Sequence, residues 1–306
     1  MPSPSTSSNT PTSNNPSSSI PTTGTSSTST TTNIQPLSCL KQVLAGQAFN
    51  IQQILGLTPL YSLQTSLNAK YGVFPSTKPT SPGALNYFGI GIGGRRIVSS
   101  QNLTQPQEIN TTNMDLYQPI PIRVVPYEQD LSPTEQANYR MRQVQTINGQ
   151  KYVCYWLQTI TKDNSQIQYF KLDSQGNLEP YTPDPSNLNP TPPTPSTDGT
   201  VNSIGAEINV VAQITLNVSG NDVAEAISVL YNGDARYANI SEVGLYSGCD
   251  ETESYTNYQG QTQSYTEALN VHLHTQYTYN GTDLSSPNST LTQNWYLGSG
   301  RVIFVS

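Results

Sequence analysis

The sequence predicts an α+β fold dominated by strands, with antiparallel sheets, a small N-terminal helical pair and extended arms. Three observations lead to this prediction. Apolar residues recur at helical spacing in only a few segments, chiefly within residues 37–72 and 221–231. Most other apolar residues fall in β-branched and aromatic runs bounded by turn signals such as Asn148-Gly149. Residues 1–36 and 179–200 have polar or Pro-rich compositions without periodicity.

Composition favours assembly over nucleic-acid binding. Charged residues are 11% of the 306 residues, and Ser, Thr, Asn, Gln and Tyr take their place. Such surfaces suit contacts that become buried, because amides and hydroxyls avoid the desolvation cost of ions. The net charge is −7 with only 13 Lys plus Arg, so we expect no nucleic-acid partner, which would need basic patches.

Cysteine usage and hydropathy set the expected compartment. Cys39, Cys154 and Cys249 are odd in number and far apart, so we expect reduced thiols and neither a disulfide framework nor a zinc ribbon. No segment is long and apolar enough to span a bilayer, and residues 1–30 lack the features of a signal peptide. We therefore expect folding in a cytoplasm and no membrane partner.

Residues 1–36 form a low-complexity, Ser/Thr-rich arm that neighbouring chains would have to order. Residues 37–178 are predicted as a domain that begins with two helices. The first carries apolar residues up to a stop at Gly56: Leu40, Val43, Leu44, Ile51, Ile54 and Leu55. The second has an N-cap, a proline, an apolar stripe and a glycine stop: Thr58, Pro59, Leu60, Leu63, Leu67 and Gly72. We expect the two helices to pack together in the core.

The rest of this domain is predicted from turn chemistry. Ser132 and Glu135 have the spacing of a capping box and predict a short helix. Asn148-Gly149 predicts a tight hairpin, and a second turn at residues 162–165 would complete a three-stranded meander.

Residues 179–200 predict a Pro-rich linker or arm, and residues 201–306 a β-rich domain with one helix. The helix is predicted over 221–231, closed by Asn232-Gly233. Strands are predicted over 206–218, 237–247, 262–279 and 290–305, with turns at Ser247-Gly248 and Asn280-Gly281. In the strand over 237–247, Val243 and Leu245 would face one side and Glu242, Gly244 and Tyr246 the other.

The glycine-rich stretch over residues 86–100, NYFGIGIGGRRIVSS, superficially resembles a dinucleotide-binding loop. No helix is predicted directly after its glycines, so we predict no nucleotide cofactor. Its glycines favour close backbone approach at a turn or a subunit contact. Arg95-Arg96, the only adjacent basic pair, predicts either a solvated or ion-paired turn or a partner contact. The candidate assembly-interface residues are Gly89, Gly91, Gly93, Gly94, Arg95 and Arg96.

Two clusters could suggest metal binding. His272 and His274 lie two apart on a predicted strand, so they would share a face and could bind one metal ion together, yet no third ligand accompanies them. Cys249, Asp250 and the glutamates that follow would lie in a loop after the Ser247-Gly248 turn, without the spacing of a calcium loop. We predict no catalytic residue, no cofactor and no metal.

Several phrases of the sequence resemble virion structural proteins of tailed bacteriophages. They are LGLTPLYSLQTSLNAKYGVFPST, NYFGIGIGGRR, DLSPTEQANYRMRQVQTINGQKYVCYWL, NLNPTPPTP and ISEVGLYSG. The resemblance covers about residues 55–250 and contains no active-site motif. It implies a non-enzymatic structural subunit of the neck, tail or baseplate, located in the virion after synthesis in the host cytoplasm. Its partners would be copies of itself and other virion proteins.

Two other functions stay open at this point. The 19 tyrosines would suit a receptor-binding module that stacks on surface glycan, although tyrosines on half-polar strands also serve packing and interfaces. A glycan-degrading enzyme needs only two carboxylates that meet in space, which a sequence does not display.

Overall fold

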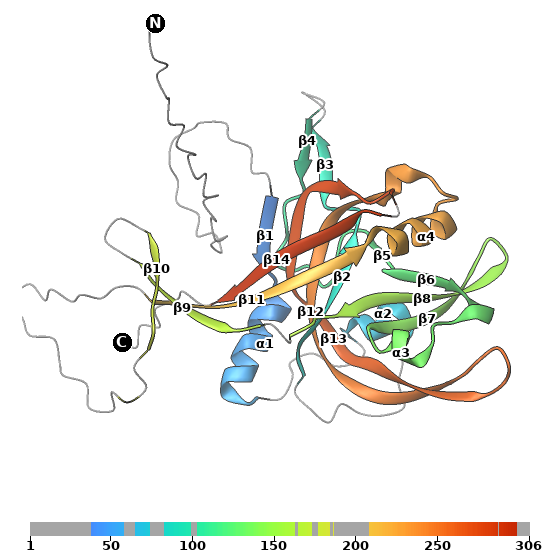
Figure 1. The fold of residues 1–306 in the computed structure, drawn as a ribbon, viewed down its shortest axis with the longest axis horizontal. Helices are drawn as coiled ribbons and strands as arrows, with labels where there is room; N and C mark the ends of the chain where they lie inside the picture. Colours follow the sequence, from blue (N-terminus) through green and yellow to red (C-terminus); the bar gives the residue numbers. More distant parts are fainter. Residues whose placement is uncertain are drawn as a thin grey trace, which may run out of the picture.

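The computed structural model describes most of the chain between residues 38 and 298. The described residues are 38–57, 65–73, 83–98, 103–162, 165–172, 177–183, 186, 208–286 and 288–298. Strands dominate them and every strand pair is antiparallel, which confirms the predicted strand-dominated α+β class (Figure 1). Among these residues, no helix has the length and apolar character needed to cross a membrane.

A large sheet of eight strands forms the centre. Its order is β1-β13-β12-β2-β8-β6, with β5 paired to β2 and β7 paired to β8. The bounds are β1 (Ser38–Gln42), β2 (Ala84–Gly91), β5 (Pro119–Ile120), β6 (Arg123–Pro126), β7 (Tyr139–Ile147), β8 (Gln150–Thr159), β12 (Asn239–Thr256) and β13 (Thr262–Asp283). Strands from both halves of the sequence pair directly here, so residues 37–178 and 201–306 share one sheet.

Two smaller sheets accompany it. The four-stranded sheet has the order β10-β9-β11-β14, and β3 and β4 form a separate ribbon. The bounds are β3 (Arg95–Val98), β4 (Leu103–Pro106), β9 (Ile167–Leu172), β10 (Leu178–Pro180), β11 (Ile208–Ser219) and β14 (Thr290–Gly298). Of the predicted arm over 179–200, Glu179 and Pro180 lie in β10, while most of the rest, like the predicted arm over 1–36, falls outside the described residues.

The predicted meander is only partly right. The β7–β8 hairpin is confirmed, with φ of 50° at Asn148 and 81° at Gly149. The third strand, β9, pairs with β10 and β11 instead of β8. β7 occupies one edge of β8, while β6 and β2 occupy the other, so β8 has no edge left for β9.

Within the ranges that the structure describes, the helices are short and few. They are α1 (Leu44–Leu55), α2 (Leu67–Tyr71), α3 (Pro133–Gln136) and α4 (Gly220–Leu230), with two 3₁₀ turns, η2 (Tyr127–Gln129) and η3 (Ala235–Ala238). Gly56 and Gly72 end α1 and α2 in the left-handed conformation, as predicted, and the Ser132 capping box and α4 are also confirmed. The N-terminal part of the first predicted helix was wrong, because residues 38–42 form β1 against β13. Most of the second predicted helix, from Thr58 to Leu63, lies outside the described residues.

β12 and β13 are much longer than predicted. Ser247-Gly248 is not a turn, since β12 continues to Thr256, and Asn280-Gly281 is not one either, since β13 continues to Asp283. A register irregularity between Ile240 and Glu242 accommodates the residues around Gly281 within the ladder. Residues 249–253, CDETE, therefore lie on a strand, where their backbone pairs with β13, and not in the predicted loop. Val243 and Leu245 face one hydrophobic cluster and Tyr246 the other, as predicted, but neither side of this strand is exposed, because residues 240–249 are all buried.

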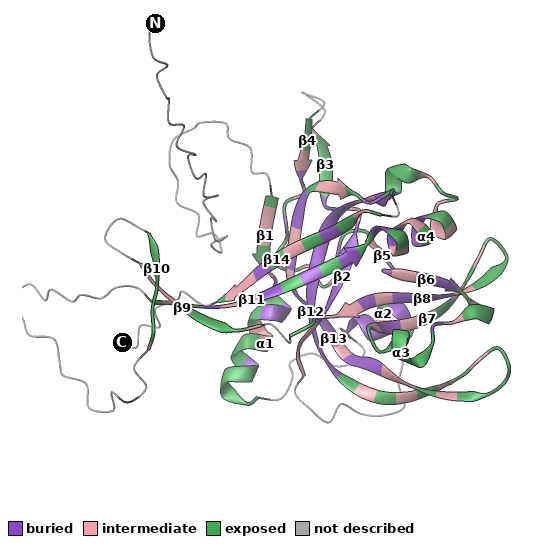
Figure 2. Cartoon of the chain, viewed as in Figure 1, coloured by how far each residue is buried: buried purple, intermediate pink, exposed green. Residues whose placement is uncertain are grey.

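The large sheet is covered on both sides (Figure 2). One hydrophobic cluster joins it to the four-stranded sheet and α4, through residues such as Leu245, Leu216 and Val223. A second cluster on the opposite side joins it to α2 and the start of α1, through Tyr246, Leu67 and Val43. Adjacent residues of β12 enter different clusters because side chains alternate along a strand.

Candidate functional site

The centre of the large sheet contains a group of buried acidic residues, which is unusual in a chain with so few charges. Glu242 and Glu267 are completely buried, at 0% exposure each. A buried carboxylate is tolerated only when hydrogen bonds or opposite charges replace its water. The partners of these residues therefore show what the arrangement can do.

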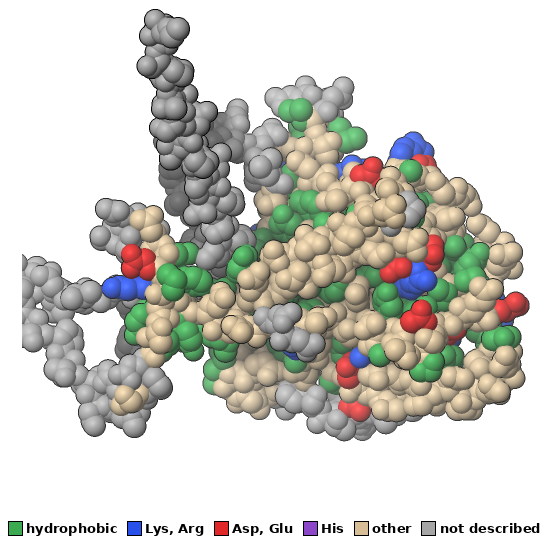
Figure 3. Space-filling view, viewed as in Figure 1, with side chains coloured by type: hydrophobic (Ala, Val, Ile, Leu, Met, Phe, Trp, Pro, Cys, Tyr) green, Lys and Arg blue, Asp and Glu red, His purple; other side chains and the backbone are tan. Residues whose placement is uncertain are grey.

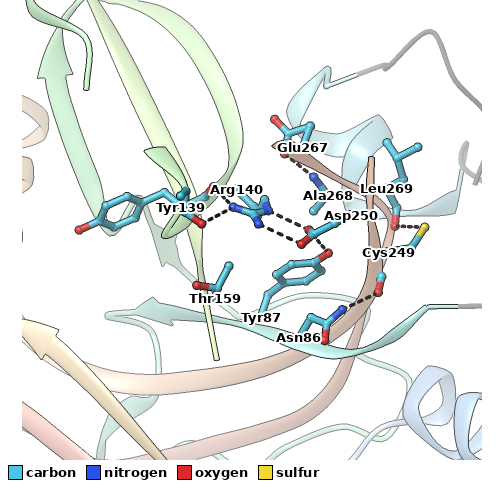
Figure 4. A network of polar contacts seen from close by, with 12 residues as sticks. Asn86, Tyr87, Tyr139, Arg140, Thr159, Cys249, Asp250, Glu267, Ala268 and Leu269 are labelled. Carbon is cyan, nitrogen blue, oxygen red and sulfur yellow. Dashed lines mark hydrogen bonds and ion pairs between the residues drawn. The ribbon is translucent and has the colours of Figure 1, made fainter. Parts of the chain in front are cut away.

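Asp250 joins three strands (Figure 4). Nε and Nη2 of Arg140, on β7, donate to its two oxygens at 2.8 and 2.9 Å, and the hydroxyl of Tyr87, on β2, donates to Oδ1 at 2.7 Å. Nη1 of Arg140 donates to two backbone carbonyls, those of Ala137 and Tyr139. Burial raises the pKa of Asp250, but the hydrogen bonds from Arg140 and Tyr87 outweigh it and hold this pKa below its usual value.

Glu267, on β13, is held by backbone amides. The amides of Met141 and Ala268 donate to Oε1 at 2.6 and 2.7 Å, and that of Arg142 donates to Oε2 at 3.0 Å. Met141 has a φ of 57°, a left-handed conformation that is rare for a residue with a side chain. Burial raises the pKa of Glu267 to about 7 despite these donors.

Glu242, on β12, explains the glycine-rich stretch. Its carboxylate accepts hydrogen bonds from the amides of Gly93, Tyr117 and Gln118 at 2.8 to 3.0 Å, and from the side chain of Gln276. A Cβ at Gly91 would lie 2.5 Å from Oε1 of the same carboxylate. Burial raises its pKa, against the effect of these donors. The close backbone approach expected of the glycines is thus made within the chain.

The candidate interface residues divide into two groups. Gly89, Gly91 and Gly94 are buried inside the chain, and a Cβ at Gly94 would meet the carbonyl oxygen of Ser241 at 2.0 Å. Arg95 and Arg96 are exposed on β3, where Arg96 forms an ion pair with Glu108 at 3.3 Å. A partner contact at these arginines stays a prediction.

Two further aspartates, Asp115 and Asp130, join other segments of the chain to the large sheet. Asp115 accepts from the hydroxyls of Tyr71 and Tyr246 at 3.0 and 2.8 Å and pairs with Lys70. Asp130 accepts from Arg142 at 2.7 Å and, at 2.6 Å, from the hydroxyl of a buried tyrosine on β8. Each carboxylate connects segments that are distant in the sequence.

These contacts give the acidic residues a structural role. Glu242 and Glu267 are closed by donors of this chain, whereas Asp250 keeps 42% of its side chain exposed beside its ion pair with Arg140. A carboxylate held by such donors fixes the position of backbone segments. Cys249, next to Asp250, is also engaged, because its thiol donates to the carbonyl of Leu269 at 3.6 Å. The combination of a thiol with carboxylates that the sequence displays is therefore part of the ladder between β12 and β13. All three cysteines are free thiols, as predicted.

The two histidines are engaged in the same region. Nε2 of His274 lies 3.0 Å from Oδ1 of Asn50 on α1, and Nδ1 lies 2.8 Å from the hydroxyl of Thr275. Nε2 of His272 lies 3.1 Å from Oδ1 of Asn270. Burial lowers the pKa of both imidazoles to about 4. Within the described ranges, no group of three or more His, Cys, Asp or Glu side chains could hold a metal ion.

A small pocket lies between α3 and the β12–β13 pair. It has a volume of about 210 Å³, smaller than the roughly 300–1,000 Å³ of common ligand sites. The residues that line it are mainly polar and uncharged: Pro133, Gln136, Ala137, Thr252, Ser264, Tyr265 and Thr266.

The sequence signal for these sites was weak but present. Glu242 and Glu267 are single acids within strongly apolar or β-prone runs, SEVGLY and TEALNV. In a chain with 11% charged residues, an acid at such a position indicates a buried carboxylate with partners elsewhere. The partners themselves, backbone amides from distant loops, leave no pattern in the sequence.

Comparisons with known proteins identify a family without giving a function. The model of a family of unknown function, DUF7208, matches residues 28–306, so the chain belongs to that family. No curated protein and no solved structure showed a significant match to the sequence.

Proposed function

We propose that this member of the DUF7208 family is a non-enzymatic structural subunit that assembles with copies of itself. The rigid centre described above would serve as a scaffold, and uncovered surfaces around it would form the contacts. One observation carries the proposal, which is the direction of the apolar stripe on α1.

The apolar stripe of α1 faces away from the protein. Leu44, Ile51, Ile54 and Leu55 lie on one side of the helix, since they are spaced by seven, three and one residues. They are 45%, 55%, 78% and 63% exposed, and Leu57, just after the helix, is 52% exposed. The expected packing of this stripe in the core is therefore wrong.

The inner side of α1 approaches β13 closely. Ala45 and Gly46 are buried, and a Cβ at Gly46 would lie 2.2 Å from the carbonyl oxygen of His274. Asn50 reaches the imidazole of the same histidine, and the ring of the half-buried Phe49 meets this imidazole edge-on, with centroids 5.9 Å apart. Because the close approach leaves no room for a side chain at Gly46, the aliphatic stripe of the helix lies on its outer side.

An exposed apolar stripe of this kind is typical of a contact surface. Soluble monomers rarely leave large apolar side chains contiguous and uncovered. A second copy is the occupant that we propose, because charged residues are only 11% of the chain and contacts between its uncharged polar surfaces avoid the desolvation cost of ions. The exposed stripe offers the apolar centre of such a contact.

Projecting ribbons support the same function. The β3–β4 ribbon and the β9–β10 region extend from the body (Figure 1). Ile97 and Leu103, on the β3–β4 ribbon, are 74% and 47% exposed. Two-stranded ribbons are marginally stable alone, so a neighbouring subunit would stabilise them.

The resemblance to tailed-phage virion proteins supports a place in the neck, tail or baseplate. It rests on sequence phrases within about residues 55–250, several of which form the centre of the large sheet. In that setting, other virion proteins would be further partners. We propose no catalytic residue, because the buried carboxylates of Glu242 and Glu267 are closed by donors of this chain and Asp250 is held in an ion pair with Arg140.

Native mass spectrometry of the purified full chain tests the assembly proposal. The wild-type chain should form defined oligomers, and Ile54→Asp should shift them to monomer, because a charge would be desolvated in the contact. Val144→Asp is the matched control, since Val144 is also an exposed apolar residue, 43% exposed, but lies on β7. It should leave the oligomers unchanged.

Two results would count against assembly through α1. Either a wild-type chain that stays monomeric over the accessible concentration range, or equal effects of the two variants, would overturn it. A folded monomer that binds immobilised surface glycan would instead favour the receptor-binding alternative.

A further inference from the structure

The core-facing side of the four-stranded sheet continues past the part of the protein that covers it. Along β11, Ile214, Leu216 and Val218 are buried in the cluster beneath the sheet. Since side chains alternate along a strand, the same side of β11 carries Val210 and Ile208. These two residues are 40% and 41% exposed. An apolar surface made for burial is thus left uncovered at this end.

β9 and β10 widen the uncovered surface. Tyr169 pairs with Val210, and Ile167, on the same side of β9, is 65% exposed. The amide of Tyr181, just after β10, donates to the carbonyl of Tyr169, and Tyr181 is 37% exposed. We call Ile167, Tyr169, Tyr181, Ile208 and Val210 the overhang surface. Figure 3 shows hydrophobic side chains gathered at the end of the molecule where β9 and β11 lie.

β14 ends beside the overhang surface. Its last residue, Gly298, pairs with Val211, and a Cβ at this glycine would lie 2.6 Å from the carbonyl oxygen of Val210. Residues 299–306, SGRVIFVS, follow outside the described part of the chain. Residues 302–305 are Val, Ile, Phe and Val, and the family match extends to residue 306. A strongly apolar segment therefore starts where an uncovered apolar surface begins.

We propose that residues 301–306 dock across the overhang surface of their own chain as an extended apolar segment. Gly298-Ser299-Gly300 gives the backbone the freedom to turn from β14 over the sheet. Three strand spacings, about 14 Å, separate β14 from β10, and six extended residues reach about 20 Å. The segment is long enough to cover β11, β9 and the beginning of the segment after β10.

The tether selects the segment over other occupants. A segment joined to the sheet by two residues has an effective concentration in the millimolar range, which free copies in solution do not reach. Docking within one chain also avoids the loss of translational and rotational freedom that association between chains requires. This docking is independent of the proposed contact through α1.

Cysteine cross-linking tests the docking. Cys154 and Cys249 are buried, so a chain with Cys39→Ser offers a background without accessible thiols. In this background, Val210→Cys with Ile303→Cys should be joined by a short bismaleimide within one chain, which peptide mapping of the monomer band would identify. Val144→Cys with Ile303→Cys is the control pair and should not be joined. Repeating both pairs with Ile54→Asp separates docking from oligomerisation, since the cross-link should form in the monomer.

Hydrogen exchange gives a second reading. A chain that ends at Gly300 should keep its overall fold by circular dichroism and exchange faster by at least about tenfold in β9 and in residues 208–212, because these lose their cover. Absence of the 210–303 cross-link would overturn the proposal, as would cross-links found only between chains. Unchanged exchange in the folded, shortened chain would overturn it too.

Discussion

Replacing the buried carboxylate of Glu267 should change how the stability of the protein depends on pH. Burial raises its pKa to about 7, against 4.5 in the unfolded chain. That gap corresponds to about 3 kcal/mol, because one pKa unit is about 1.4 kcal/mol. The protonated form is the one that the folded state favours, so this contribution is full below pH 4.5 and is lost as the pH rises through 7. Above that pH the folded chain must keep a charge at a fully buried position.

The groups around Glu267 set this behaviour. Arg140, on β7, and the amide donors lower its pKa, while Tyr265, on β13, and Glu251, opposite it on β12, supply no positive charge. Glu267→Gln removes the titration but keeps the size of the side chain. The variant also loses some stability because the amide NH₂ group of Gln faces a backbone N–H, but this loss does not vary with pH.

Urea unfolding of wild type and Glu267→Gln between pH 4.5 and 8 measures the effect. The free energy of unfolding of wild type, relative to the variant, should fall by about 3 kcal/mol across this range. Glu135→Gln is a control of opposite sign, because the hydrogen bonds from Ser132 hold the pKa of Glu135 below its usual value. For that pair the relative stability of wild type should rise with pH only up to about the unfolded pKa of 4.5 and then stay nearly flat to pH 8. A relative stability of Glu267→Gln that is flat from pH 4.5 to 8 would refute the reasoning.

Three further predictions concern other residues of the centre. His272 and His274 are the only histidines, and burial lowers the pKa of both to about 4, so nuclear magnetic resonance titration should show both midpoints well below 6.5. The unfolded chain binds protons first, so the free energy of unfolding should fall as the pH falls from 6.5 through 4. Midpoints near 6.5 would contradict the burial. Asp250→Asn should destabilise the protein by about 2 kcal/mol in urea unfolding, because it removes a charged partner from Arg140, whose side chain is 6% exposed. A double-mutant cycle with Arg140→Met that shows no coupling would exclude the ion pair as the cause. Gly94→Ala should lower stability by about 1–3 kcal/mol, since its Cβ would overlap a backbone carbonyl of β12, and an unchanged melting temperature would show that the loop moves freely.

Local chemistry was readable from the sequence, whereas pairing over long distances was not. Gly56, Gly72 and the Asn148-Gly149 turn were predicted correctly, because each depends on the backbone preference of one or two residues. The partner of β9 was missed, because it depends on which strand edges other segments have already filled. Gly248 was misread as a turn for the same reason, since pairing with Ala84 on β2 keeps this residue in a strand.

The candidate site shows the same division. Periodicity identified the stripe of Leu44, Ile51 and Ile54 but gave no direction for it, and Gly46 against β13 decides that direction. Glu242 and the glycines near it were noticed separately in the sequence. Their contact joins residues about 150 positions apart through backbone amides, which carry no side-chain signal. The sequence therefore identified individual residues of this site but did not predict which of them are in contact.

The central claim is that the outward side of α1 is buried between copies of the chain. Oxidative footprinting of the full chain, read by mass spectrometry at Ile51, Ile54 and Leu55, measures this burial directly. Above the concentration at which oligomers form, modification of these residues should drop by at least about tenfold relative to the dilute monomer, while Val144 stays equally modified. Equal modification of the α1 residues in monomer and oligomer would contradict the account.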